Sequence, residues 1–323
     1  MEKALVDKKQ KKPLKQTVMN GLKRFKNQIW LQIMVIPGIV WLIIFCYIPM
    51  YGIIIAFQEF NPIVDKIYSG EWVGLAQFRS FFSDPVAWRA IANTLGISIL
   101  KFLIGFPAPI LFALLLNEVT ALKFKKFAQS VSYLPYFISW VILASMLRNI
   151  LDPSGPINTL LINLGFIEEG ISFISKPGMF WPILIITDLW KGVGWSSIIY
   201  IAAIAGINQE MYESALIDGA KRYQRILYIT IPSIMPTVTI LMILGISGIL
   251  GSNFDQHYLL NNAAVSEVAE TIDTYVFRMG MSLNRYSYAT AVGLARSVVS
   301  FVLLFGANKL VRHMSKGEYG LFT

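Results

Sequence analysis

Six apolar segments of roughly 20 residues or more dominate this chain and limit its possible folds more than any other feature. A helix needs about 20 apolar residues to cross a bilayer, and only helices and closed barrels satisfy their backbone hydrogen bonds there. Charged residues make up 15% of the 323 residues, against about 25% in soluble domains. The pattern predicts an all-α, polytopic membrane protein with six transmembrane helices. The segments lie at 30–57, 91–117, 127–150, 180–204, 231–252 and 287–310.

Residues that carry enzymatic chemistry are scarce in this sequence. Its one cysteine, Cys46, cannot form an internal disulfide, and its two histidines, His257 and His313, are too few and too far apart for a metal site. No G-x-x-x-x-G-K-[ST] motif occurs, so the chain lacks the loop with which many ATPases hold phosphate. The sequence therefore predicts no enzymatic activity and no cofactor for this chain by itself.

The net charge of +9 is unevenly distributed. A basic stretch directly before a membrane span is typical of a cytoplasmic anchor on anionic lipid rather than of nucleic-acid binding, and binding of a partner by this stretch is the alternative. With the N-terminus inside, the cytoplasmic pieces hold eighteen Lys or Arg and the outer loops six, which predicts that both termini are cytoplasmic. Nine of the eighteen are Lys3, Lys8, Lys9, Lys11, Lys12, Lys15, Lys23, Arg24 and Lys26.

The predicted spans divide the chain into successive parts. Asp84 and Pro85 form a helix-start signal, with Asp84 as N-cap and Pro85 at the first helical position. In the last outer loop a short helix is expected at about 265–279. The parts are a basic cytoplasmic tail at 1–29, the first transmembrane helix at 30–57, an outer loop at 58–90, a five-helix core at 91–312 with a polar loop at 208–232, and a cytoplasmic tail at 313–323.

The polar segment 208–236 separates the fourth and fifth predicted spans. Asn208 is a good N-cap, and Gly219 allows a sharp turn with positive φ. A short amphipathic helix held between two spans suits a groove on a soluble partner, whereas packing on lipid alone is the simpler alternative. The segment contains an apolar face of Met211, Tyr212, Ala215 and Leu216, the cations Lys221, Arg222 and Arg225, and Pro232 at the start of the fifth span.

The stretch WKGVGWSSIIYIAAIAGINQEMYESALIDGAKRY resembles the corresponding stretch of carbohydrate ABC importer permeases. It carries the spacing Glu-x-Ala, three residues, Gly, nine residues, Ile-x-hydrophobic-Pro at Glu213, Ala215, Gly219, Ile229 and Pro232. Ser214 departs from the alanine that is usual there, but it is also small. The resemblance covers about 37–312 and is closest to the branch that includes importers of alginate and pectin fragments. Its other matching segments are AFQEFNP, WVGLAQF, FFSDPVAWRAIANTL, SYLPYFISWV, FDQHYLLNN, IDTYVFRMG and YSYATAVGL.

This resemblance implies a type I ABC importer permease fold in the bacterial cell membrane, with a cytoplasmic coupling helix in 208–232. It implies a complex with a second permease of different sequence, two ATPase subunits that hold ATP and Mg²⁺, and an extracytoplasmic binding protein that delivers a glycan. The implied function is import of oligosaccharides or polysaccharide fragments, acidic ones among them. A permease for simpler sugars and an ATP-independent secondary transporter are the alternatives. The residues implied to couple to the ATPase are Glu213, Ser214, Ala215, Gly219, Ala220 and Pro232.

Charged residues within membrane spans are costly and usually functional. Asp188 and Lys191 lie three residues apart on one predicted helix and can neutralise each other. Lys101 and Arg296 can each pair with a uronate carboxylate, with a partner subunit, or reach toward water. Aromatic rings beside polar groups suit sugar rings, although tryptophans also gather at membrane interfaces. The predicted substrate path comprises Trp190, Lys191, Trp195, Lys101, Arg296, and Asp255 and Gln256 from a polar cluster at 253–258 outside the fifth span.

Overall fold

A computed structural model describes residues 28–67, 69–251 and 253–314. Within these ranges the chain is mostly helical, and its one small sheet pairs β1 (Gln58–Glu59) with β2 (Glu71–Trp72) in antiparallel orientation. The predicted all-α fold is confirmed. Most of the basic tail 1–29 and most of the C-terminal tail 313–323 lie outside the described residues. The chain divides into two compact units, residues 1–54 and 55–323.

The described part of the first unit is a single apolar helix, interrupted by a widened turn. It comprises α2 (Ile29–Leu42), a π-helical turn η1 (Ile43–Tyr47) and α3 (Ile48–Met50), followed by the 3₁₀ turn η2 (Tyr51–Phe57). None of the side chains in α2, η1 or α3 is buried, as expected of a helix that is hydrophobic on every side and faces lipid. The π turn ends two residues before Pro49. Proline has no backbone N–H and its ring clashes with the carbonyl four residues earlier, so a regular α-helical turn is disfavoured there.

The second unit contains the long helices and several short ones. Its helices before residue 206 are α4 (Ala76–Ser83), α5 (Pro85–Gly105), α6 (Pro107–Glu118), α7 (Leu122–Tyr133), η3 (Leu134–Phe137), α8 (Trp140–Ile150), α9 (Pro156–Asn163), η4 (Phe173–Ser175) and α10 (Pro177–Ala205). Those that follow are α11 (Gln209–Ile217), α12 (Arg222–Arg225), η5 (Ile226–Thr230), α13 (Ile231–Ser247), α14 (Phe254–Leu260), α15 (Ser266–Ala269), α16 (Ile272–Phe277), η6 (Arg278–Ser282) and α17 (Tyr286–Met314).

Among the described residues, four helices are long and apolar enough to cross a membrane, and six spans result if two bent pairs are each counted as one. The six predicted spans agree with the larger count. The third differs from a straight helix, because Leu122–Phe137 and Trp140–Ile150 meet at 97°. The second bent pair joins Pro177–Ala205 to Gln209–Ile217 at 69°. The single helices are Ile29–Phe57, Pro85–Glu118, Arg222–Ser247 and Tyr286–His313.

The start of α5 follows the predicted capping pattern. The Asp84 side chain accepts a hydrogen bond from the Val86 N–H at 2.8 Å, with Pro85 in the first turn. The helix predicted at about 265–279 is wrong as a single element, because it is divided into α15, α16 and η6. The Asn93 side-chain amide donates hydrogen bonds to the Glu267 and Glu270 backbone carbonyls at 2.7 and 3.0 Å. The Thr271 backbone N–H donates to the Thr274 hydroxyl at 2.9 Å. These bonds end one short helix and start the next.

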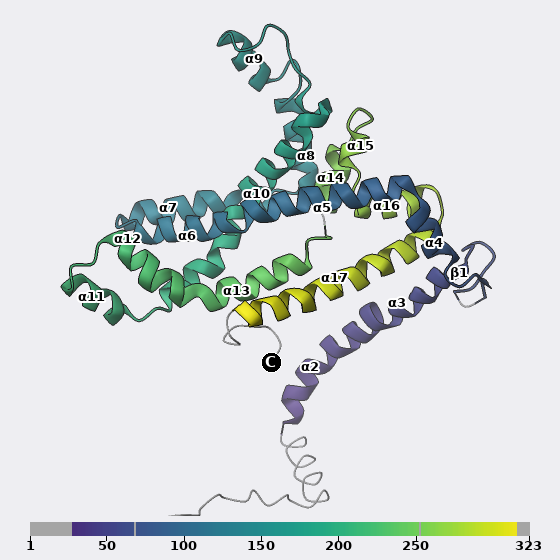
Figure 1. The fold of residues 1–323 in the computed structure, drawn as a ribbon, viewed down its shortest axis with the longest axis horizontal. Helices are drawn as coiled ribbons and strands as arrows, with labels where there is room; N and C mark the ends of the chain where they lie inside the picture. The colour runs from purple at the N-terminus through teal and green to yellow at the C-terminus, as the bar shows by residue number, and fades with distance from the viewer. Residues whose placement is uncertain (1–27, 68, 252, 315–323) are drawn as a thin grey trace, which may run out of the picture. The chain divides into compact units, whose positions relative to one another are not determined.

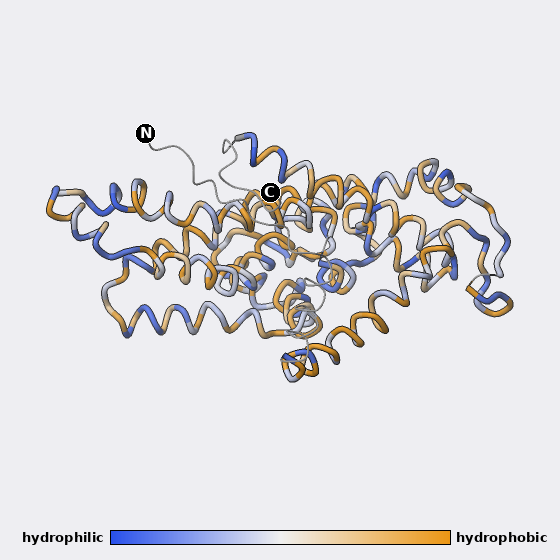
Figure 2. Tube along the Cα trace, turned by 90° about the horizontal axis from the view of Figure 1, so that it is seen from below, coloured by the Kyte–Doolittle hydropathy of each residue, from blue (hydrophilic) through white to orange (hydrophobic). Residues whose placement is uncertain are grey.

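Helix α10 is central to the second unit, where it packs against α5, α6, α7 and α13, while α13 packs against α17 (Figure 1). Hydrophobic residues follow the long helices and hydrophilic residues gather in the segments that connect them (Figure 2). Burial is concentrated in separate apolar clusters, one of which includes Ile97, Phe180 and Leu184. Many large apolar side chains on the long helices remain exposed, as expected for helices that lie against lipid.

Candidate functional site

The loop between α10 and α13 folds as the sequence predicts. The Asn208 side chain accepts a hydrogen bond from the Glu210 N–H at 3.0 Å and caps α11. Gly219 has φ +74°, a conformation that favours glycine, and the Ala220 N–H closes the end of α11 by donating to the Ala215 carbonyl at 2.8 Å. The predicted helix, turn and second helix are therefore all present.

The predicted apolar face of α11 is only partly covered by the rest of the chain. Tyr212 is half-buried against the cluster that contains Ile204, Ile207 and Ile234, whereas Met211 and Leu216 are exposed. The Tyr212 hydroxyl lies 2.8 Å from the Thr230 hydroxyl, which belongs to the π turn before α13. Helix α11 is thus held to α13 through Tyr212, while Met211 and Leu216 of the same apolar face remain exposed.

Ile217 is an apolar residue of α11 that is 88% exposed, and the sequence pattern did not indicate it as a site residue. It occupies the last position of α11, two residues before the left-handed Gly219. The helical spacing placed Tyr212, and not Ile217, on the apolar face, which agrees with the half-buried Tyr212 and the exposed Ile217. Glu213 and Ser214 are exposed beside it. The outer side of α11 therefore combines apolar and acidic groups.

A groove of about 390 Å³ runs beside α11 and is lined by Glu118 at the end of α6, by Glu213, and by Arg222 and Arg225 of α12. Pro232 is exposed and follows the π turn η5 at the same spacing as Pro49 follows η1. The predicted start of the fifth span at 231 is late, because the helix continues back to Arg222 through this widened turn. Ala220 is half-buried.

Replacing Tyr212 by phenylalanine is expected to loosen α11. The change removes the hydrogen bond to Thr230 and keeps the ring in place, so it should cost about 0.5–1.5 kcal/mol. Hydrogen–deuterium exchange of the solubilised protein should then show faster exchange of the α11 amides. Tyr223→Phe, at an exposed ring on α12, is the matched control and should leave α11 unchanged. Equal exchange in both variants would mean that the bond does not hold α11.

A second group of polar residues lies in the interior of the second unit. The Lys101 ammonium on α5 donates to the Gln256 side-chain oxygen at 2.5 Å and forms an ion pair with Asp188 of α10 at 3.8 Å. The Gln256 amide donates to the Leu184 carbonyl at 2.8 Å and to the Thr187 hydroxyl at 2.9 Å. This network joins α5, α10 and α14 across more than 150 residues of chain.

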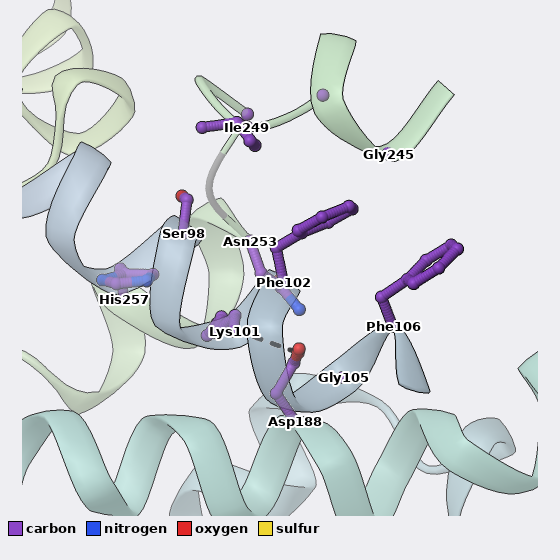
Figure 3. A pocket seen from close by; sticks show the side chains of 12 residues that line it. Ser98, Lys101, Phe102, Gly105, Phe106, Asp188, Gly245, Ile249, Asn253 and His257 are labelled. Carbon is purple, nitrogen blue, oxygen red and sulfur yellow. Dashed lines mark ion pairs between the residues drawn. The ribbon is translucent and has the colours of Figure 1, made fainter. Parts of the chain in front are cut away.

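The network lies beside a cavity of about 320 Å³. Figure 3 shows the Asp188 carboxylate turned toward Lys101, with Phe102 and Phe106 projecting from the same helical segment. The two rings are stacked, with centroids 5.2 Å apart. Of the predicted substrate-path residues, Lys101 is therefore brought to a cavity wall, and Gln256 is brought to Lys101. Asp255 is exposed at the start of α14.

The predicted neutralisation of Asp188 by Lys191 is wrong, because the ion pair of Asp188 is with Lys101. The Lys191 ammonium instead donates to the Pro135, Tyr136 and Ile138 carbonyls at 3.2, 2.7 and 2.5 Å. These carbonyls lie at the break between η3 and α8, where the helical hydrogen bonds are interrupted. Lys191 thus satisfies the backbone of the bent third span.

Two other candidates on the predicted path have structural partners. Arg296 forms an ion pair with Asp273, and its pairing with a uronate or a partner subunit stays a prediction. Trp195 stacks on Tyr136 with centroids 4.5 Å apart and an interplanar angle of 4°. Trp190 is about half exposed. The seven predicted residues therefore do not form one site.

His257 belongs to the polar cluster predicted outside the fifth span, yet it is fully buried. Its Nδ1 lies 3.4 Å from the Ala269 carbonyl, and its Nε2 is buried without a hydrogen-bond partner in the described part of the chain. Burial, aided by the nearby Lys101 ammonium, lowers the pKa of His257 to about 3 against the weaker effect of the Ala269 carbonyl. The imidazole is therefore neutral at physiological pH.

Acidification is expected to destabilise the protein through His257. The pKa of His257 is about 3 in the folded state and 6.5 in the unfolded chain. Between these pH values the unfolded chain therefore binds more protons than the folded protein. Stability is therefore lost as the pH falls from 6.5 toward 3, by at most about 1.4 kcal/mol for each pH unit. When thermal unfolding is measured between pH 7 and 4, the unfolding midpoint should fall less steeply with decreasing pH for His257→Leu than for the wild type. Parallel curves would contradict this origin.

Within the described ranges, no three His, Cys, Asp or Glu side chains are grouped as a metal ion would require.

The sequence pattern of one protein family, the binding-protein-dependent transport system inner membrane component, matches residues 105–316. Protein LplB of Bacillus subtilis (strain 168) is 41% identical over 305 residues, which cover 94% of this chain and 93% of LplB. The polygalacturonan/rhamnogalacturonan transport system permease protein YteP of the same organism is 41% identical over 297 residues, covering 92% of this chain and 91% of YteP.

Solved structures agree with this assignment. A chain in the crystal structure of a bacterial ABC transporter involved in the import of the acidic polysaccharide alginate superposes with a TM-score of 0.83 at 39% identity, covering 91% of this chain and 99% of the other. A chain in the structure of a bacterial alginate ABC transporter in complex with alginate pentasaccharide-bound periplasmic protein gives 0.83 at 38%, covering 93% and 99%. This chain belongs to the family of binding-protein-dependent transport system inner membrane components, the membrane permeases of ABC importers.

Proposed function

We propose that this chain is the permease subunit of an ATP-driven importer of oligosaccharides or polysaccharide fragments. The observation that carries the proposal is similarity over nearly the whole chain to a permease named for polygalacturonan and rhamnogalacturonan transport and to alginate transporter structures. The chain itself performs no chemistry; ATP and Mg²⁺ belong to partner ATPase subunits. A permease for simpler sugars is the second candidate, favoured by a relative named for lactose transport at 25% identity.

In this proposal, α11 is the coupling helix that docks on an ATPase subunit. Its outer side presents Glu213, Ser214 and the exposed Ile217, which suit a groove with an apolar floor and a basic or hydroxyl group. Ala215 and Ala220 allow close approach, and Gly219 supplies the turn. Movement of α11 would reach α13 through Tyr212, Thr230 and the π turn before Pro232.

The proposed orientation places both termini and α11 in the cytoplasm, because the basic residues gather on that side. The domain boundaries predicted from the sequence, with a coupling loop at 208–232, belong to the same proposal. An extracytoplasmic binding protein would deliver the glycan to the opposite face, and a second permease of different sequence would complete the membrane domain. Basic side chains of the N-terminal tail would contact anionic lipid.

The test is purification of the tagged chain from gently crosslinked membranes, followed by ATP-dependent glycan uptake in vesicles. Recovery of an ATPase, a second permease and a binding protein, with uptake that requires ATP, is the expected result. Uptake without ATP would instead favour a secondary transporter. Recovery of this chain alone under crosslinking would contradict the importer assignment.

Ile217→Asp is expected to abolish ATPase recruitment while the permease still folds. The substitution places a charge in the proposed docking contact, and Ile217 is already exposed, so folding should be unaffected. Loss of about tenfold or more in ATPase co-purification is expected. Ile63→Asp, at another exposed apolar residue but in the outer loop between the first two spans, is the matched control and should retain the ATPase. Equal recovery from both variants would exclude α11 as the docking element.

A further inference from the structure

The groove beside α11 contains charges of both signs that form no ion pair with one another. Glu118 at the end of α6 and Glu213 of α11 line it together with Arg222 and Arg225 of α12. Among the described residues, none of these four side chains forms an ion pair, although all four border one volume of about 390 Å³. Charged groups of both kinds are therefore available in the groove to another molecule.

Arg225 is the member of this set whose surroundings most clearly require a partner. Its Nε is buried and has no hydrogen-bond acceptor within the described ranges. An arginine keeps its charge in a protein, and a buried charged donor without an acceptor is costly. Buried polar groups are hydrogen-bonded in the great majority of cases, so each exception calls for a physical reason. A carboxylate supplied by another molecule would satisfy this donor.

The position of the groove favours a protein over a lipid as the source of that carboxylate. Tyr212 and Leu216 of α11 line the same groove, so it is continuous with the helix that the proposed function places on an ATPase subunit. The phosphate of an anionic lipid would bring only negative charge next to Glu118 and Glu213. A protein segment can bring a carboxylate to the arginines and a basic or hydroxyl group to the two glutamates.

From these observations we infer that the groove receives an acidic side chain of the ATPase subunit, which pairs with Arg225. The inference rests on the proposed function and adds a second contact beside the outer side of α11, together with the charge that the partner carries there. A guanidinium and a carboxylate can form two parallel hydrogen bonds, so this contact orients the ATPase as well as holding it. Because the helix that contains Arg225 runs without a break from Arg222 to Ser247, the contact connects the ATPase directly to the fifth span.

The first experiment replaces the guanidinium by an amine and joins it covalently to its partner. The Arg225→Lys permease is purified with its ATPase and treated with a water-soluble carbodiimide, which couples an amine to a carboxylate in direct contact. Mass spectrometry of the linked peptides should identify an Asp or Glu of the ATPase attached at position 225. A link from position 225 to Glu118 or Glu213 of the same chain, or no link there, would overturn the inference.

Recovery of the ATPase tests the same contact without a crosslinker. Arg225→Met keeps the apolar stem of the side chain and should lower ATPase co-purification by at least about tenfold, because the partner carboxylate is left unpaired in the contact. Lys123→Met removes an exposed charge at the start of α7, outside the groove, and should lower recovery by less than about threefold. An equal loss in both variants would show that general positive charge, rather than the groove, holds the ATPase.

Thermal unfolding of the free permease separates docking from a role of Arg225 in the fold. The midpoint of Arg225→Met should equal or exceed that of the wild type, because the substitution removes a buried charged donor that lacks an acceptor. A lower midpoint would mean that Arg225 stabilises this chain itself and would overturn the inference. An ATPase that co-purifies with the wild type while these tests fail leaves the importer assignment intact, whereas a wild-type preparation without any ATPase would contradict the proposed function itself.

Discussion

Gly194→Ala is expected to destabilise the membrane core strongly. A Cβ added at Gly194 would lie 2.5 Å from the carbonyl carbon of Ser132, closer still to its oxygen, and 3.0 Å from its Cβ. The obstacle is backbone, so α7 would have to move away from α10. Overpacking of this kind costs about 1–3 kcal/mol and more where the backbone cannot yield. A lower midpoint of thermal unfolding and a smaller monodisperse fraction in size-exclusion chromatography should follow.

Gly192 offers a matched control on the same helix. An added Cβ there meets nothing within 4 Å, and both glycines lie inside α10, so the change in helix propensity is the same. Gly192→Ala should therefore be neutral or slightly stabilising, since alanine is favoured over glycine within helices. If both variants unfolded at the same temperature, the close approach of α7 and α10 would not limit stability.

Lys191→Met is the second change with a large expected effect. It keeps much of the side-chain length but leaves the Pro135, Tyr136 and Ile138 carbonyls without their donor at the break in the third span. In a membrane core no water replaces these bonds, so we expect a loss of about 2–5 kcal/mol. It would appear as a lower unfolding midpoint and as faster amide exchange in α8.

Two variants test whether the donors of Lys191 cause this loss. Lys191→Arg supplies charged N–H groups and should recover part of the stability, because guanidinium donors can reach more than one carbonyl. Lys176→Met removes an exposed lysine just before the same helix and should have little effect. Full stability of Lys191→Met would show that the bent span holds its shape without the ammonium group.

Local structure in this protein followed from short-range patterns. Asp84 before Pro85, Asn208 before α11 and the left-handed Gly219 could each be predicted because the interactions involved join residues within a few positions of one another. The break at 138–139 could not, since an apolar run with one proline fits both a kinked and a straight span. The Ile138 carbonyl at this break accepts a hydrogen bond from Lys191, which is more than 50 residues away in sequence.

The partners of the buried charges required tertiary structure. Helical spacing suggested that Asp188 neutralises Lys191, yet Asp188 faces Lys101 on another helix, and Arg296 faces Asp273. A charged residue on a packed helix has neighbours on other helices as well as the residue three positions away on its own helix, so helical spacing alone does not identify its partner. For the same reason, spacing could not show that Tyr212 is half-buried while Leu216, on the same face of α11, is exposed.

The sequence by itself determined that this chain crosses the membrane several times as helices, because the apolar length of each segment and the need to satisfy the backbone within lipid leave few other folds. It also determined the family, through the spacing from Glu213 to Pro232. Only the tertiary structure decided which charges are already paired and which face a cavity. Those pairings join helices that are distant in sequence, and their energies depend on distances between side chains that no local pattern encodes.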